Sequence, residues 1–116
     1  MLKVRVREEE NLLEIKMEGH ADYAEAGKDI VCSACSILLF TLLEELQKQQ
    51  ATGKVKITVL EMEESGRCRM EITDWVKETE VVLETIFNGY KIIEKNFPKN
   101  ISFVAKIGSC KKNKLI

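Results

Sequence analysis

The stretch DIVCSACSILLFTLLEELQKQQ, residues 29–50, decides the architecture of this 116-residue chain. Asp29 is a favourable N-cap, and the apolar run after it predicts a helix from Ile30 to about Gln50. This segment is apolar on most faces as far as Leu46, and polar residues return only near its end. A helix that is hydrophobic nearly all round needs cover on more than one side. We therefore expect it to pack on a sheet, and on either a second helix or a partner subunit.

Two alternating segments precede this helix. Residues 2–7 and 13–18 each alternate apolar and charged side chains, and a polar turn separates them. This pattern predicts two half-buried strands in an antiparallel hairpin. Gly19 ends the second strand and places His20 at the mouth of a loop. The loop, residues 21–28, has no periodicity and is predicted to be mobile.

Two more alternating segments follow the helix, joined by a turn at Glu64-Ser65-Gly66. Residues 54–63 predict a third strand and residues 67–73 a fourth. The alternation assigns one face of each strand, which carries Val55, Ile57, Val59 and Glu61 in the third, and Cys68, Met70 and Ile72 in the fourth.

A second helix and a last strand complete the pattern. Asp74 is predicted to cap a helix that runs to about Phe97, and Pro98 enforces its end. Alternation over residues 101–105 predicts the last strand. The order ββαββαβ has no repeat and no linker, which indicates a single domain over residues 1–116. The expected fold class is α+β, with two layers: two helices on one face of a mainly antiparallel sheet.

Composition narrows the classes of function. The chain has 18 Lys and Arg against 19 Asp and Glu, a formal net charge of −1, so we expect no direct contact with nucleic acid. The longest uninterrupted apolar run, residues 37–40, is too short to span a bilayer, which predicts no membrane contact. No signal peptide is visible at the first residues, so we expect a cytoplasmic protein whose four cysteines are free thiols.

The residues that can carry chemistry gather around the first turn of the long helix. Cys32 lies three residues after the predicted cap, where free N–H groups and the helix dipole favour a thiolate. The same amides could stabilise an oxyanion. His20, the only histidine, lies twelve residues upstream and can act as general base and then as general acid. These two residues predict a Cys–His pair for nucleophilic catalysis.

Gly19-His20-Ala21 followed by Gly27-Lys28-Asp29-Ile30-Val31-Cys32-Ser33-Ala34 resembles the signature of the bacterial ribosomal-processing cysteine protease family, Prp. The similarity of length and layout extends over nearly the whole chain. The resemblance implies a homodimeric endopeptidase without a cofactor. It further implies removal of a short N-terminal extension from large-subunit ribosomal protein twenty-seven, with cleavage after paired aromatic residues, in support of ribosome assembly.

The resemblance also assigns roles to residues of this chain. It places the nucleophile on Cys32 and the catalytic histidine on His20. Asp29 matches the acidic position before the cysteine and is expected to cap the helix or to orient its neighbours. The remaining matches are supporting serines and the residues that flank a gating loop: Ser33, Ser36, Gly19, Ala21 and Gly27. Two positions depart from the pattern, because the family usually has alanine at Ser33 and a small or branched apolar residue at Cys35.

Three alternatives stay open at this point. Cys32 and Cys35 form a CxxC pair, which is typical of a thiol–disulfide oxidoreductase and would also allow oxidation to switch off a protease. A zinc site would need His20, Cys32 and Cys35 with either Cys68 or Cys110, although only one close ligand pair exists, and we expect no metal. A non-enzymatic, ribosome-associated dimer would explain the apolar helix but not the placement of His20 and Cys32.

Overall fold

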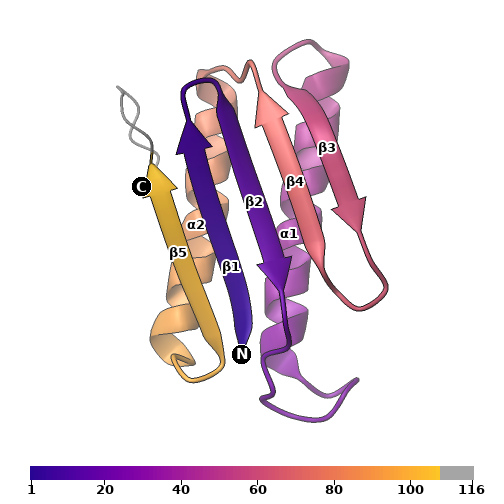
Figure 1. Cartoon of the computed structure of the whole chain (residues 1–116), viewed down its shortest axis with the longest axis vertical. Helices are drawn as coiled ribbons and strands as arrows, with labels where there is room; N and C mark the ends of the chain where they lie inside the picture. The colour runs from indigo at the N-terminus through magenta and orange to yellow at the C-terminus, as the bar shows by residue number, and fades with distance from the viewer. Residues whose placement is uncertain (108–116) are drawn as a thin grey trace.

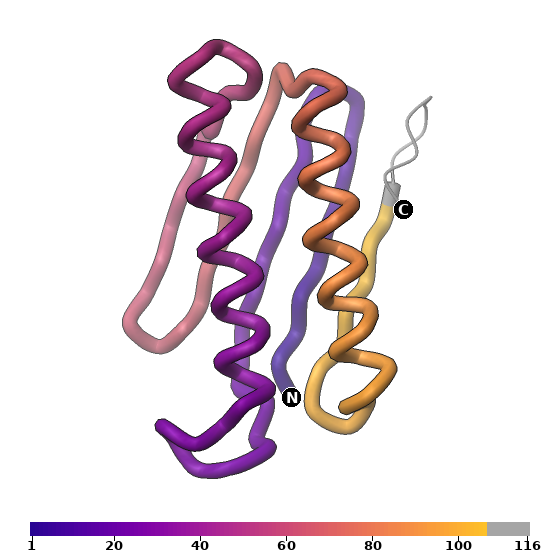
Figure 2. Tube along the Cα trace, turned by 180° about the vertical axis from the view of Figure 1, so that it is seen from behind, coloured from indigo at the N-terminus to yellow at the C-terminus, as the bar shows by residue number. Residues whose placement is uncertain are grey.

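The computed structural model describes residues 1–107, and Cys110 lies outside them. Seven elements follow the predicted order ββαββαβ, so the expected α+β fold is confirmed. Their bounds are β1 Leu2–Glu9, β2 Leu12–Glu18, α1 Ile30–Ala51, β3 Lys56–Met62, β4 Cys68–Thr73, α2 Lys77–Asn96 and β5 Ile101–Ile107. The two helices lie side by side on one face of the sheet (Figures 1 and 2).

The sheet has five strands in the order β3-β4-β2-β1-β5. Three neighbouring pairs are antiparallel, and only β1 and β5 run parallel. The parallel pair follows from α2, which returns the chain along the sheet and gives β5 the direction of β1 (Figure 1). β2 is the central strand of the sheet. Its C-terminal end lies at the end of the molecule at which α1 begins (Figure 1), so Gly19 and His20, which follow β2, lie at that end.

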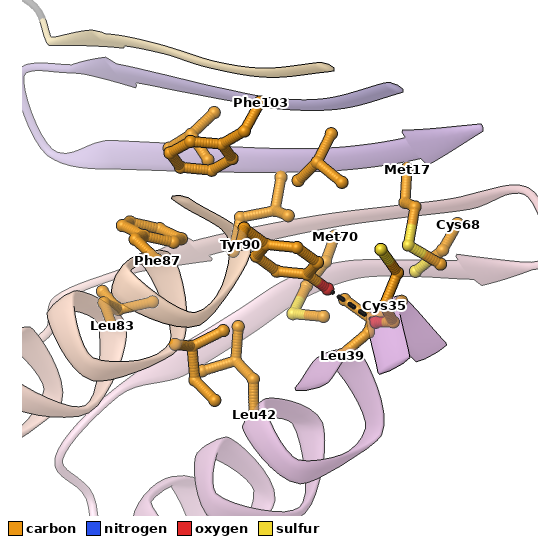
Figure 3. Close-up of a cluster of buried hydrophobic side chains, with 14 of the residues drawn as sticks. Met17, Cys35, Leu39, Leu42, Cys68, Met70, Leu83, Phe87, Tyr90 and Phe103 are labelled. Atoms are coloured by element: carbon orange, nitrogen blue, oxygen red, sulfur yellow. Dashed lines mark hydrogen bonds between the residues drawn. The ribbon is translucent and has the colours of Figure 1, made fainter. Parts of the chain in front are cut away.

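The core lies between the sheet and the two helices. Tyr90 stacks on Phe103 with ring centroids 5.9 Å apart, and Phe87 lies 5.7 Å from the same ring. Figure 3 shows this aromatic group beside the thiol of Cys35, which points from α1 toward Met17 and Cys68. The Tyr90 hydroxyl donates to the Cys35 carbonyl oxygen at 2.9 Å, and therefore joins α2 to the first turns of α1.

The outer side of α1 is uncovered. Val31, Leu39 and Leu42 are buried, but Ile37 and Phe40 keep 61% and 51% of their surface exposed. The sequence predicted cover on more than one side of α1. One side is covered in the structure, whereas the side that carries Ile37 and Phe40 is not. By length and composition alone, α1 would also qualify as a membrane span, a test that a core helix packed on a sheet passes equally well. The absence of membrane contact stays a prediction.

Two details of the sheet and of α2 differ from the expectation. A register shift between Ile57 and Val59 moves Val59 opposite Glu71 and Glu61 opposite Arg69, so these two residues do not share a face with Ile57. A bulge of this kind has no signal in strict alternation, because it breaks the period of two. The result is that Leu60 and Met62, rather than Val59 and Glu61, lie on the side of the helices.

The start of α2 was also placed too early. Asp74 adopts a left-handed φ of 55° in the turn after β4, and its carboxylate accepts a hydrogen bond from Asn11 at 3.0 Å. The N-cap is Val76, whose backbone N–H donates to the Thr79 hydroxyl at 3.4 Å. Val76 has no side-chain acceptor, so no side chain takes the N-cap role that the sequence assigned to Asp74.

Replacing Tyr90 by Phe should lower the free energy of unfolding by about 1 kcal/mol, because the buried bond to the Cys35 carbonyl is lost while the ring packing remains. Urea denaturation followed by far-UV circular dichroism measures the change. The matched control is Tyr23→Phe, since the Tyr23 hydroxyl makes no hydrogen bond among residues 1–107. Equal stability of the Tyr90 variant and the wild type would show that this link carries no stabilisation.

Candidate active site

Cys32 and His20 line one cavity of about 430 Å³ at the end of the sheet. His20 follows β2 and is exposed, whereas Cys32 lies in the first turn of α1 and is half-buried. The other residues around the cavity come from the connecting loop and from the helix start: Asp22, Ala24, Glu25, Ala26, Gly27, Asp29 and Ser33. The structure thus brings together the two residues that the sequence proposed as nucleophile and base.

The Asp29 carboxylate organises this end of the molecule. Its Oδ1 accepts from the backbone N–H groups of Val31 and Cys32 at 3.0 and 2.9 Å, which caps α1 as expected. Its Oδ2 accepts from Tyr23 and Ala24 of the loop at 2.9 and 3.3 Å. One buried side chain therefore holds the helix start and the loop in a fixed relation.

The protonation state of Asp29 follows from these contacts. Burial by itself would raise the pKa of the carboxyl group, since it penalises the charged form. Four backbone donors outweigh burial and hold the pKa below the ordinary value of 3.8. Asp29 is therefore a carboxylate at neutral pH, and it occupies the position where the helix dipole favours an anion.

This arrangement overturns one expectation about the helix amides. The N–H groups of Val31 and Cys32 donate to Asp29 Oδ1, and that of Ser33 donates to the Asp29 carbonyl oxygen at 3.1 Å. They are therefore engaged, and they are not free to hold an oxyanion or to stabilise a thiolate directly. The sequence missed this because a capping carboxylate and an incoming anion compete for the same donors.

A different donor reaches the sulfur of Cys32. The backbone N–H of Ala21 donates to Cys32 Sγ at 3.3 Å. Ala21 is buried, and its carbonyl oxygen accepts from the Asn100 side chain at 2.9 Å. Ala21 therefore presents a backbone donor to the sulfur itself, whereas the amides of Val31, Cys32 and Ser33 are engaged elsewhere.

Asn100 is a residue of the site that sequence reasoning missed. It follows α2, 79 positions away from Ala21 along the chain, and no local pattern connects the two. The ring of Tyr23 also contacts Phe97, edge to face, with centroids 5.3 Å apart. The end of α2 therefore supports the start of the loop, and the sheet order that brings them together is the only signal that could have indicated it.

The glycines of the loop have different roles. Gly19 has a φ of +91°, and a Cβ there would lie 2.5 Å from the Met1 carbonyl oxygen. Only glycine fits this turn into the segment that carries His20. Gly27 also has a positive φ, +87°, but nothing lies within 4 Å of its Cβ position. Ala21 and Tyr23 anchor the first part of the loop, whereas residues 24–28 are exposed beside the cavity, and their role as a gate stays a prediction.

The two supporting serines separate in space. Ser33 is exposed and lines the cavity of Cys32. Ser36 lines a second, smaller cavity of about 80 Å³, together with Met17, Leu39, Phe40, Met62, Glu63, Gly66, Arg67 and Cys68. The structure therefore does not place Ser36 with the candidate catalytic residues.

Cys35 belongs to the core and not to the site. Its side chain is fully buried, and burial, followed by the charges of Cys32 and Asp29, raises the pKa of its thiol to about 12. Such a thiol is a poor nucleophile, which argues against a CxxC redox centre. Within residues 1–107, no three His, Cys, Asp or Glu side chains are grouped to hold a metal ion; Cys110 lies outside this range.

Comparison with known proteins identifies the family. The family model described as Cysteine protease Prp matches residues 1–102. A Staphylococcus aureus protein, the ribosomal processing cysteine protease Prp, is 25% identical over 99 residues, which cover 84% of this chain and 91% of that protein.

Two crystal structures of Staphylococcus aureus Prp have the same fold. The complex with a covalently linked product peptide has a TM-score of 0.77 at 24% identity. The complex with a substrate peptide has a TM-score of 0.65 at 23% identity. Each comparison covers 91% of this chain and all of the other.

Asp29→Asn should keep the helix cap but release the loop, because an amide presents only one acceptor oxygen and turns N–H groups toward Tyr23 and Ala24. We expect a loss of about 1 kcal/mol in unfolding free energy at pH 7. The lowered pKa of Asp29 stabilises the fold fully at pH values above 3.8, the ordinary pKa of the group. The difference in unfolding free energy between the wild type and the variant should therefore disappear as the pH falls below 3.8 and through the folded-state pKa. Urea titrations of both proteins from pH 7 to acid test this, and a gap independent of pH would contradict it.

The match over residues 1–102, together with a buried cap that brings Cys32 and His20 to one cavity, places this chain in the Prp cysteine protease family.

Proposed function

We propose that this protease removes a short N-terminal extension from large-subunit ribosomal protein twenty-seven, cuts after paired aromatic residues, and so supports ribosome assembly. The observation that carries the proposal is the cavity shared by Cys32 and His20, with the Ala21 N–H on the sulfur. The name of the Staphylococcus aureus relative, a ribosomal processing protease, supports the substrate class. The reaction would take place in the cytoplasm, where thiols stay reduced.

In this mechanism Cys32 Sγ attacks the scissile carbonyl carbon while His20 takes the thiol proton. His20 then gives the proton to the leaving amine, and a water molecule activated by His20 hydrolyses the thioester. His20 makes no hydrogen bond among residues 1–107 and is exposed, so its ring is free to turn toward the sulfur and the substrate. Ala21 supplies the candidate oxyanion donor, because its N–H lies beside the attacking sulfur, next to which the carbonyl oxygen of a bound substrate would lie.

Cys32→Ser and His20→Ala should each reduce cleavage by at least about a hundredfold, because each removes one half of the proton-transfer pair. The substrate is a synthetic peptide with paired phenylalanines near its N-terminus, incubated with reduced protein and followed by mass spectrometry. Mass spectrometry of the products also locates the cleaved bond.

The matched control is Cys35→Ala, which removes the buried second cysteine of the CxxC pair. It should keep the cleavage activity, because the Cys35 thiol points into the core. No cleavage by the reduced wild type would contradict the proposal and favour a redox or binding role. Cleavage of other peptides but not of the peptide with paired phenylalanines would refute the proposed substrate, although the protein would still be a protease.

We also propose that the enzyme is a homodimer and that the uncovered side of α1 forms its interface. Ile37 and Phe40 are exposed there, and Met62 of the neighbouring β3 is 43% exposed. Phe40→Glu should shift the protein to monomer in analytical ultracentrifugation, since a buried charge without a partner destabilises an interface. The control is Ile92→Glu on α2, which is 62% exposed on the other helix and should not change the mass. A wild-type monomer at micromolar concentration would contradict the proposal.

A further inference from the structure

The face of the sheet opposite the helices is open in this fold (Figures 1 and 2). Alternation along β1 turns Lys3, Arg5 and Arg7 to this face, while Val4 and Val6 enter the core. Charged side chains from β2, β4 and β5 lie beside them in the strand register. Most residues of the open face are therefore charged, and the strand register shows which charges lie opposite one another.

Three cations lie in one row across three strands. Arg5 of β1 is directly opposite Lys16 of β2, and Lys16 is directly opposite Arg69 of β4. Like charges in such positions destabilise a sheet. Arg69 is neutralised by Glu14, Glu61 and Glu71. Arg5 and Lys16 have no ion pair among residues 1–107, so the repulsion between them has no internal compensation.

The carboxylates of the face are all taken by other cations. Arg7 binds Glu9 and Glu14 at 2.8 and 3.2 Å, and Arg67 lies 3.6 Å from Glu18. Within the described part of the chain, four cations on this face form no ion pair: Lys3, Arg5, Lys16 and Lys106. The net charge of −1 averages over all faces and conceals this local excess of positive charge.

The four cations are spaced for a ligand that carries regularly repeated anions. They come from β1, β2 and the edge strand β5, which are neighbours in the sheet. Adjacent strands are about 4.8 Å apart, and side chains on one face of a strand repeat about every 6.8 Å. A shallow cavity of about 390 Å³ lies between them, lined by Arg5, Val6, Arg7, Glu14, Lys16, Val104 and Lys106.

We propose that this open face binds RNA through its phosphate backbone. The inference goes beyond cleavage, because the face is opposite the layer that carries Cys32; only the choice of RNA among polyanions rests on the proposed ribosomal substrate. None of the residues that the register places on the face is aromatic. Bases therefore have no surface on which to stack, and binding is independent of sequence. In its bound state, RNA relieves the repulsion between Arg5 and Lys16.

Fluorescence anisotropy with a labelled single-stranded oligouridylate tests the proposal on the intact protein. Four phosphate contacts give a slope of about −3 for the logarithm of the association constant against the logarithm of salt concentration. The double variant Arg5→Gln, Lys16→Gln should bind at least roughly tenfold more weakly at low salt and lower the slope by about half. Its stability should stay equal or increase, because like charges are removed.

The matched control is Lys91→Gln, Lys95→Gln, which makes the same change in net charge on α2, away from the open face, and should leave RNA binding unchanged. Peptide cleavage, measured in parallel, should be unaffected in both variants, so failure of RNA binding and failure of the proposed function are distinguishable. Equal weakening by the two double variants, binding of polyglutamate in place of RNA, or no binding of RNA at low salt would each overturn the proposal.

Discussion

The carboxylate of Asp29 is the contact on which the site depends. Two of its hydrogen bonds fasten the first turn of α1, and two fasten the loop that follows His20. Without it, the chain between β2 and α1 would have eleven residues in which to move relative to the helix. With the Asp29 carboxylate in place, Cys32 and His20 line a common cavity, although no hydrogen bond joins the two side chains in the described structure. The acidic position before the cysteine is therefore best understood as a positioning residue and not as a third catalytic group.

Much of the fold could be predicted, because local patterns specify it. The alternation of the strand segments, the apolar character of α1 and the stop at Pro98 together predicted the order ββαββαβ. The failures occurred where one residue changes the local rule. The register shift after Ile57 reverses the faces of the rest of β3. Asp74, the expected cap of α2, is instead a turn residue with a left-handed φ.

The sequence indicated that Cys32 and His20 could lie together, and the structure places both at one cavity, but the contacts that support them could not be predicted. Cys32 and His20 were indicated by residue type and by their positions beside a helix start and a strand end. The hydrogen bond from Ala21 to sulfur, and the support of Ala21 by Asn100, depend on the placement of α2 beside the loop. Pairwise contacts across 79 residues follow from the order of strands in the sheet, which no single sequence reveals. The expectation of free amides at the start of α1 was wrong because the capping carboxylate of Asp29 already accepts their hydrogen bonds.

Residue-specific amide hydrogen exchange in the loop tests the central claim most directly. If Asp29 holds the loop, the N–H groups of Tyr23 and Ala24 should exchange slowly in the wild type, although both residues are exposed. Ala26, whose amide makes no hydrogen bond within residues 1–107, serves as the reference and should exchange fast. In Asp29→Asn, the first two should approach the rate of the reference. Fast exchange of Tyr23 and Ala24 in the wild type would contradict the account, because the loop would then be positioned by something other than this carboxylate.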